Sequence, residues 1–312
     1  MPRPSEAPRP VAPGPRSGLA LRWRALRAFS LPLSALPALM ALLAVAPPWR
    51  WRPLPAAAVL VGVPSLHLVG NLLNDYFDFL SGADRRTDAD ADRPGRLLVH
   101  GRLRPVDVLA LAGVFAALAL AAGGVLLWLR GWPVALAAGV AFAGAWAYTA
   151  PPAALKRRAC GEGLIFLLFG PGLMIAAAWA YSGQWNLTAA LLSVPVGLAT
   201  TTVLVGNNLR DAEEDRAAGV LTLAHLADGR LSRALFVALP LAAVVGVAAL
   251  AAAGAIGRGA LAAPATLLLL RRPARAILAG QRLPDVDART GRWATALFAL
   301  SAVSQVLASL GV

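Results

Sequence analysis

The sequence has few charged residues and almost no cysteine or histidine. Of its 312 residues, 14% are charged, whereas soluble globular domains average about 25%. The single cysteine, Cys160, excludes an internal disulfide, and three histidines are too few for a histidine-built metal site. In contrast, 58% of the residues are hydrophobic and the mean hydropathy is +0.64. This composition excludes an ordinary soluble enzyme and indicates a membrane protein.

Nine apolar segments follow a stretch rich in proline and arginine at residues 1–22, which we expect to be a disordered basic tail. A membrane-spanning helix needs about 20 apolar residues. Residues 23–312 are therefore predicted to form one all-α transmembrane domain, a helical bundle of about nine spans. The eighth segment is the shortest. The nine segments are 26–47, 54–80, 105–129, 131–150, 162–181, 187–208, 233–256, 258–270 and 292–311.

The basic residues alternate with the predicted spans. All but four flank one side of the predicted membrane domain; the exceptions are Arg50, Arg52, Arg130 and Arg258. Because cytoplasmic loops carry the excess of arginine and lysine, we expect a multi-pass cell-membrane protein with a cytoplasmic N-terminus and an external C-terminus. The net charge of +13 is then explained by orientation in the lipid bilayer, and nucleic acid is not expected as a partner.

Polar residues gather at the ends of the second and sixth apolar segments. Spacings of three and four residues place the members of each group on one helical face. Each group precedes a polar loop, residues 81–104 and 209–232, and these loops are expected to cap the site. The two groups indicate two helices that face one cavity at the cytoplasmic boundary. The first group is Asn71, Asn74, Asp75 and Asp78, and the second is Asn208, Asp211 and Asp215.

These carboxylates predict a magnesium site. A charge at mid-membrane costs about 2.5–3.5 kcal/mol on insertion scales. A single aspartate would suit a solvated helix end, but two matched clusters favour a shared ligand. Clustered carboxylates repel one another unless cations hold them, and Mg²⁺ prefers carboxylate oxygens together with substrate phosphates. The spacing thus predicts Mg²⁺ bridging to a diphosphate-like ligand. Nearby basic residues would take the remaining charge: Lys156, Arg157, Arg158 and Arg210.

At these residues the sequence resembles the UbiA superfamily of intramembrane aromatic prenyltransferases. Within it, the sequence is most similar to the MenA-type 1,4-dihydroxy-2-naphthoate polyprenyltransferases. The resemblance covers nearly the whole chain after the tail, and the second acidic stretch is its most specific part. The stretches that carry it are Asn74–Asp84, Asn207–Asp211 with Asp215, Arg216, Gly219 and Thr222–Ala224, Tyr148–Pro152, Gly161–Glu162, Phe169–Pro171 and Arg27–Pro32.

The resemblance implies Mg²⁺-dependent transfer of a polyprenyl group from prenyl diphosphate to an aromatic acceptor. In the MenA branch that acceptor is 1,4-dihydroxy-2-naphthoate, used in menaquinone biosynthesis. The implied catalytic and metal-binding residues are Asp75, Asp78, Asp211 and Asp215. The implied substrate contacts are Asn74, Asn208, Lys156, Arg157, Arg210, Asp84 and Tyr148. Tyr148 is equally compatible with an aromatic at the membrane interface, and Glu162 is interpreted as a first-turn residue favoured by the helix dipole.

Other functions stay open on the sequence alone. The 4-hydroxybenzoate branch carries a third aspartate where this chain has Gly82, and Val220 stands where many relatives carry lysine. The acid comes two residues later, at Asp84, as in the MenA branch. Within the superfamily, 4-hydroxybenzoate, homogentisate or a tetrapyrrole are the alternative acceptors. A secondary transporter also uses intramembrane carboxylates, but these are expected near the middle of the bilayer. A CDP-alcohol phosphotransferase would need an aspartate pattern that the sequence lacks.

The distribution of arginines generates a topology prediction. In a chain without Cys160, we expect Ala91→Cys to react with a membrane-impermeant thiol reagent only from the cytoplasmic side, and Arg258→Cys only from outside. Labelling of intact cells against labelling of inverted vesicles measures this. Reaction of the residue 91 thiol in intact cells would contradict the orientation.

Overall fold

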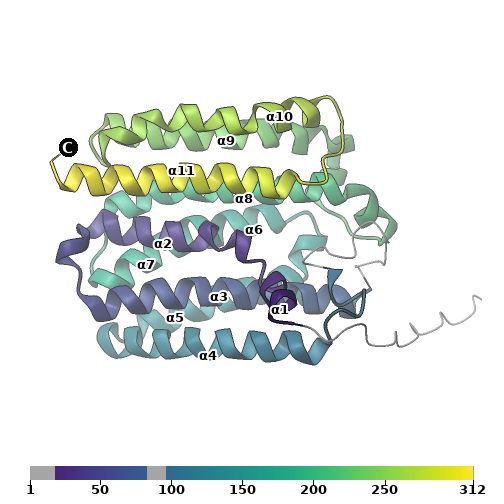
Figure 1. Cartoon of the computed structure of the whole chain (residues 1–312), viewed down its shortest axis with the longest axis horizontal. Helices are drawn as coiled ribbons and strands as arrows, with labels where there is room; N and C mark the ends of the chain where they lie inside the picture. The colour runs from purple at the N-terminus through teal and green to yellow at the C-terminus, as the bar shows by residue number, and fades with distance from the viewer. Residues whose placement is uncertain (1–17, 83–95, 312) are drawn as a thin grey trace, which may run out of the picture.

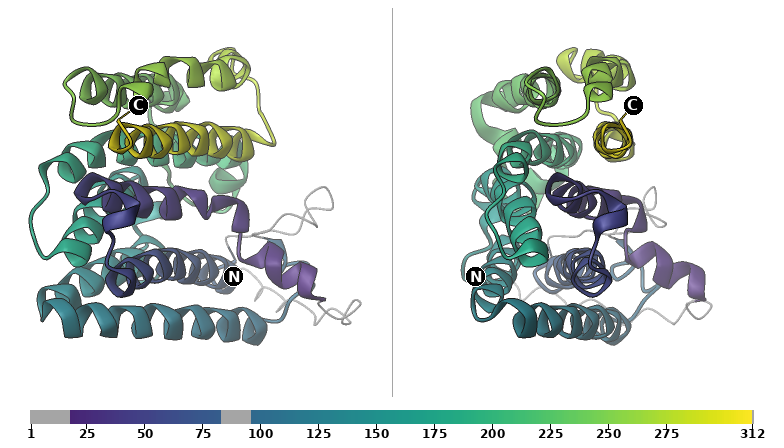
Figure 2. Two further views of the ribbon diagram at one scale, coloured as in Figure 1. Left: turned by 60° about the vertical axis from the view of Figure 1, so that its left-hand side comes forward. Right: turned by 90° about the vertical axis from the view of Figure 1, so that its left-hand side faces the viewer.

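Residues 18–82 and 96–311 are described by the computed structural model of the chain, and within them the backbone is helical with no β-strand. This confirms the predicted all-α class. The long helices run side by side (Figure 1) and are seen nearly end-on in the right panel of Figure 2. The α-helices are α1 (Leu19–Ala25), α2 (Pro32–Val45), α3 (Pro53–Leu80), α4 (Pro105–Arg130), α5 (Pro133–Thr149), α6 (Gly161–Leu167), α7 (Leu173–Ser182), α8 (Leu187–Ala217), α9 (Arg230–Ala252), α10 (Arg271–Leu278) and α11 (Val286–Ser309).

Each predicted apolar segment coincides with helical structure, but the segments differ in length. Six helices of the described residues are long and apolar enough to cross a membrane, and α5 is a shorter apolar helix. The eighth segment forms 3₁₀ turns over Arg258–Leu270 and continues into α10. The chain is therefore a polytopic membrane protein, and the count of nine spans stays a prediction. The six helices are Ala28–Val45, Pro53–Leu80, Pro105–Arg130, Gly161–Ser182, Leu187–Ala217 and Leu223–Ala252.

Proline is the first residue of helices α2, α3, α4 and α5. Pro32, Pro53, Pro105 and Pro133 each occupy the first helical position, where the missing N–H has no intrahelical partner to lose and the fixed φ suits a helix. Helix α8 begins differently, because the Asn186 side chain accepts a hydrogen bond from the Ala189 N–H at 2.8 Å. Local sequence therefore determines where these helices start.

Helix α8 extends beyond the predicted end of its apolar segment at residue 208. It continues to Ala217, so the first part of the predicted loop 209–232 is helical. The physical reason is that its charged residues have partners there: Arg210 pairs with Asp211, and Glu214 pairs with Arg282. The acidic residues of the second group consequently stand on a rigid helix.

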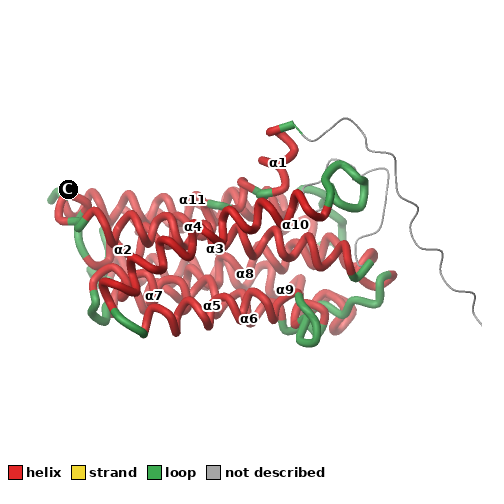
Figure 3. Tube along the Cα trace, turned by 90° about the horizontal axis from the view of Figure 1, so that it is seen from below, coloured by secondary structure: helices red, strands yellow, loops and turns green. Residues whose placement is uncertain are grey.

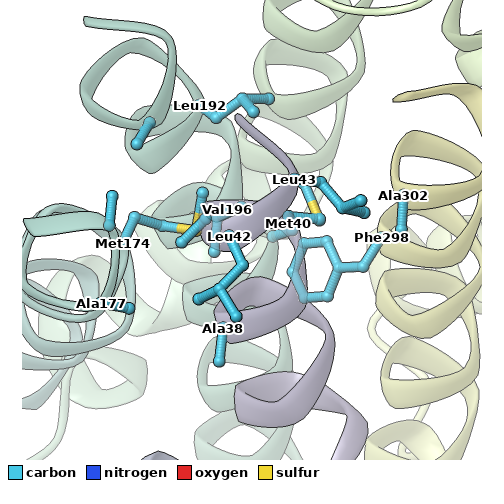
Figure 4. Packing of buried hydrophobic residues seen from close by; sticks show 14 of the residues in the cluster. Ala38, Met40, Leu42, Leu43, Met174, Ala177, Leu192, Val196, Phe298 and Ala302 are labelled. Atoms are coloured by element: carbon cyan, nitrogen blue, oxygen red, sulfur yellow. The ribbon is translucent and has the colours of Figure 1, made fainter. Parts of the chain in front are cut away.

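Helix α2 lies in the centre of the bundle. Its residues Ala38, Met40 and Leu42 are fully buried, and they pack against side chains of α7, α8 and α11 (Figure 4). Helix α1 stands off the layer of long helices (Figure 3). The C-terminal ends of α3 and α8 lie at the end of the bundle opposite the chain's C-terminus (Figure 1). The core thus brings the two acidic groups to one end.

Two glycines permit a close crossing between α8 and the helix that contains α6. A Cβ at Gly170 would lie 2.6 Å from the Ser193 carbonyl oxygen, and one at Gly197 would lie 2.7 Å from the Phe166 ring. Gly170 belongs to a π-helical turn, Leu168–Gly172, that joins α6 to α7. These distances are shorter than normal van der Waals contacts in a packed protein interior. The close crossing therefore requires glycine at both positions.

We expect Gly197→Ala to lower the melting temperature of the detergent-solubilised protein, since overpacking costs roughly 1–3 kcal/mol. Gly163→Ala is the matched control, because a Cβ at Gly163 meets nothing within 4 Å. Circular dichroism melts measure both variants. Equal melting temperatures for Gly197→Ala and wild type would show that the helices can separate without cost.

Candidate active site

A single cavity of about 1550 Å³ joins the two acidic groups. Its polar end is lined by Asn74, Asp78, Asp211 and Asp215, and its walls further along are mainly apolar. Helix α3 lines it from Ala58 to Asp78, which at 1.5 Å per residue corresponds to about 30 Å. The hydrocarbon core of a bilayer is about as thick. The cavity as a whole, from its apolar end to its charged end, is therefore about as deep as the hydrocarbon core.

The only lysine of the chain is held at the polar end by the first acidic group. Its ammonium Nζ lies 2.5 and 2.6 Å from the two carboxylate oxygens of Asp78 and 2.6 Å from Asn74 Oδ1. The Arg157 guanidinium lies 3.3 Å from Asp78. Tyr148 lines the same end, with its ring centroid 5.8 Å from the Lys156 ammonium. The predicted residues Asn74, Asp78, Lys156, Arg157 and Tyr148 are thus brought together.

Asp75 points in another direction. Its carboxylate is 6% exposed and forms an ion pair with Arg27, the residue that precedes the short helical turn Ala28–Ser30. Asp75 does not line the cavity, whereas Arg27 does. A buried carboxylate needs such a partner, because removing one member of a buried pair leaves an uncompensated charge. The partnership of Arg27 was missed in the sequence, since it joins residues 48 positions apart.

The second acidic group faces the same cavity from α8. Asn208 donates a hydrogen bond to Glu162 Oε1 at 2.7 Å, and Asp215 lies within electrostatic range of Asp78, Asp211 and Lys156. Glu162 is 7% exposed. It is in the first turn of α6 as expected, but its carboxylate faces an amide of the second group. The crossing at Gly170 and Gly197 sets this contact.

Arg210 connects the second group to the last helix. Its Nε and Nη2 each lie 2.8 Å from a carboxylate oxygen of Asp211, and its Nη1 lies 2.5 Å from Asp287 Oδ2. Arg210 is 7% exposed. Asp287, in the first turn of α11, lines the cavity. No local sequence pattern indicates Asp287 as a site residue, because its contact with Arg210 forms only when α8 and α11 pack.

Backbone hydrogen bonds connect the segment that follows α5 to the segment that follows α8. An isolated β-bridge joins Arg158 to Leu221, and the Ala159 N–H donates to the Leu221 carbonyl at 2.9 Å. His225 accepts a hydrogen bond from the Thr222 N–H at 3.0 Å and donates through Nε2 to the Ala212 carbonyl at 2.8 Å. These contacts hold the segment with Lys156 and Arg157 over the end of α8.

The residues at the polar end fit a divalent cation and an anion by their chemistry. No three His, Cys, Asp or Glu side chains of the described ranges converge at metal-ligand spacing, and lysine and arginine groups contact Asp78 and Asp211. Three oxygens nevertheless surround the Lys156 ammonium, which shows that they can hold a cation. In addition, Asn207 Oδ1 and Arg157 Nε are buried without a hydrogen-bond partner. An acceptor and a donor of this kind would suit a cation and an anionic ligand respectively.

One predicted residue, Asp84, lies outside the described residues. Most of the other predicted residues lie at the polar end, but Asp75 is directed to Arg27. Arg158 does not line the cavity, because its guanidinium donates to the Pro152 carbonyl at 2.8 Å. Sequence reasoning missed three further charged residues of this region besides Arg27. They are Asp287, Arg96, which lines the cavity, and Glu214, whose carboxylate lies 2.5 Å from Arg96 and 2.6 Å from Arg282.

The comparisons with known proteins agree with this geometry. The profile of the UbiA prenyltransferase family matches residues 34–305. The chain is 34% identical over 183 residues to the 1,4-dihydroxy-2-naphthoate octaprenyltransferase of Mycobacterium tuberculosis, which covers 58% of this chain and 60% of that protein. It is 32% identical over 179 residues to UbiA prenyltransferase domain-containing protein 1 of Xenopus tropicalis, covering 56% and 50% respectively. The matched region thus spans about half the length of such curated relatives.

Solved structures show the same fold. A UbiA homologue from Archaeoglobus fulgidus bound to GPP and Mg²⁺ superposes with a TM-score of 0.63 at 15% identity, covering 92% of this chain and 99% of that one. A UbiA homologue from Aeropyrum pernix K1 gives a TM-score of 0.65 at 20% identity, covering 93% and 98%. At these identities the likeness concerns the fold alone.

Proposed function

The chain belongs to the UbiA prenyltransferase family, and we propose that it catalyses Mg²⁺-dependent transfer of a polyprenyl group from prenyl diphosphate to an aromatic acceptor. The observation that carries the proposal is the cavity described above. Two helix ends with amides and carboxylates face its polar end, a mainly apolar part continues from there, and the whole cavity is about as deep as the hydrocarbon core of a bilayer. This shape matches a molecule with a charged diphosphate head and a long isoprenoid tail.

The basic residues of the polar end would bind the diphosphate. Lys156 and Arg157 contact Asp78, and Arg210 contacts Asp211, so each acidic helix end already has positive groups beside it. Phosphate oxygens accept the same hydrogen bonds as carboxylates. Asp78, Asp211 and Asp215, which line the cavity, are proposed to hold Mg²⁺, with Asn74, Asn208 and Asp84 in support. Asp75 is proposed to join them only when it exchanges its ion pair with Arg27 for the metal ion. When bound, Mg²⁺ supplies Lewis-acid stabilisation of the negative charge on the leaving diphosphate.

Side chains of the cavity are proposed to exclude water from the reaction and to position the acceptor. The bond between C1 of the prenyl group and the diphosphate oxygen breaks, and its electron pair leaves with the diphosphate. The positive charge left on the allylic carbon must be kept from water, a role we assign to the mainly apolar walls further along the cavity. An electron-rich ring carbon of the acceptor then bonds to C1. Tyr148, beside Lys156 at the same end, is proposed to line the acceptor position.

The proposed acceptor is 1,4-dihydroxy-2-naphthoate, as in menaquinone biosynthesis. The naphthoate octaprenyltransferase of M. tuberculosis supports it, together with the resemblance of the acidic stretches to the MenA branch. The proposed location is the cell membrane, with the N-terminus and the active site on the cytoplasmic side and the C-terminus outside. Residues 23–312 are proposed as the catalytic domain and residues 1–22 as a basic tail, whose last residues, from Leu19, are not disordered but belong to helix α1. The acids stand at helix ends and not near mid-membrane, which disfavours a transporter.

Neutral replacement of the carboxylates tests the proposed site. We expect Asp78→Asn and Asp211→Asn each to lower prenyl transfer by about 10²–10³-fold, as is found when one electrostatic stabiliser of a transition state is removed. Asparagine keeps the size of each side chain but leaves Lys156 or Arg210 with less compensating charge, so we expect a lower melting temperature, and activity is measured at a temperature at which each variant is folded. Asp107→Asn is the control, because Asp107 pairs with Arg104 away from the cavity. Folded variants of residues 78 and 211 with near-full activity would refute the assignment.

Carbon dioxide release tests the acceptor. Attack on the naphthoate carbon that bears the carboxylate requires that group to leave, so we expect about one carbon dioxide per prenyl group transferred. Prenylation of 4-hydroxybenzoate at an unsubstituted carbon would instead release a proton, and we expect this compound to be a poor substrate. Membranes supplied with Mg²⁺, labelled prenyl diphosphate and each acceptor provide the measurement. Diphosphate release without carbon dioxide would keep the prenyltransferase function and overturn the naphthoate assignment.

A further inference from the structure

One guanidinium holds two carboxylates from different helices at the polar end of the cavity. Arg210 donates two parallel hydrogen bonds of 2.8 Å to Asp211 of α8, and its remaining terminal nitrogen lies 2.5 Å from Asp287 of α11. Both carboxylates line the cavity. The three groups together carry one net negative charge, so the bridge leaves the site attractive to a cation.

The position of Asp287 does not depend on Arg210. Its other oxygen, Oδ1, accepts a hydrogen bond from the Ala288 N–H at 2.8 Å, and its place in the first turn of α11 lets the helix dipole stabilise a negative charge. Asp287 therefore has a contact of its own that does not involve Arg210. It remains available to Arg210 whatever contacts Asp211 makes.

Arg210 competes directly with any divalent cation for Asp211. Both Asp211 oxygens accept from the guanidinium, and a metal ion on those oxygens would also repel it. Arg210 is 7% exposed, is always protonated, and has little access to water. A buried charge without a partner is strongly unfavourable. Arg210 can release Asp211 only if a second carboxylate is within reach, and Asp287 already contacts it.

We propose that Asp287 is a positioning residue of the site, which retains Arg210 when Asp211 exchanges its guanidinium contacts for a divalent cation bound together with a diphosphate. The inference rests on the proposed function and deepens it. Without the charge of Asp287, Arg210 remains on Asp211 and the cation binds more weakly. The last helix of the chain thereby contributes to metal affinity through Arg210.

The test is a calorimetric titration of Mg²⁺ into the full-length, detergent-solubilised protein at a fixed concentration of inorganic diphosphate. We expect Asp287→Asn to weaken Mg²⁺ binding about tenfold or more, the effect of losing one charge-assisted hydrogen bond. Asp287→Glu restores the charge and should recover most of the affinity. In turnover assays, Asp287→Asn should raise the Mg²⁺ concentration needed for half-maximal rate and leave kcat at saturating Mg²⁺ within about twofold.

Asp285→Asn is the matched control, two residues earlier in the chain. Asp285 has a side chain 49% exposed and pairs with Arg289, so its neutralisation should leave Mg²⁺ affinity unchanged. Three outcomes would overturn the inference: a lower melting temperature of Asp287→Asn with unchanged affinity, an equal loss in Asp285→Asn, or a loss confined to kcat at saturating Mg²⁺. Failure of the proposed function is distinguishable, because wild type would then bind Mg²⁺ with diphosphate but transfer no prenyl group.

Discussion

The arrangement of this protein depends on the electrostatic cost of placing several carboxylates at the boundary of a membrane domain. Each negative charge there loses hydration, and neighbouring negative charges repel one another. The chain offsets this cost with its own cations: Arg27 pairs with Asp75, Lys156 with Asp78, and Arg210 with Asp211. The cations come from three separate segments, so the site forms only when the bundle has assembled. The same cations are then in place for a polyanionic ligand.

Helix α8 connects the packing of the bundle to this site. Near its middle, Gly197 allows the helix that contains α6 to approach closely. Three turns later on the same face, Asn208 meets Glu162 from that helix. Beyond the apolar segment, Arg210 reaches α11 and Glu214 binds Arg96 and Arg282. A change in packing at the crossing would therefore move the amide and carboxylates together, because one rigid helix carries them.

The cavity separates two kinds of chemistry by position along the same helices. Its polar end concentrates charge, and its apolar part is lined by small and aliphatic side chains of α3, α4 and α5. Low dielectric in the apolar part strengthens the electrostatic interactions at the polar end. A ligand with a charged head and an apolar tail satisfies both parts at once. A compact polar metabolite would leave the apolar channel unfilled.

The sequence by itself determined the all-α membrane class, most helix boundaries and the two acidic groups, because these follow from local properties. Apolar length defines the helices, proline at residues 32, 53, 105 and 133 begins them, and spacings of three and four residues place Asn74 with Asp78 on one face. Only the tertiary structure decided that Asp75 turns to Arg27, that Glu162 meets Asn208 and that Asp287 shares Arg210. Each of these contacts joins residues that are 46 to 77 positions apart in the sequence. No local pattern encodes which side chains meet when helices pack. Charge in a buried site is balanced across the bundle, so its partners are determined by packing and not by spacing.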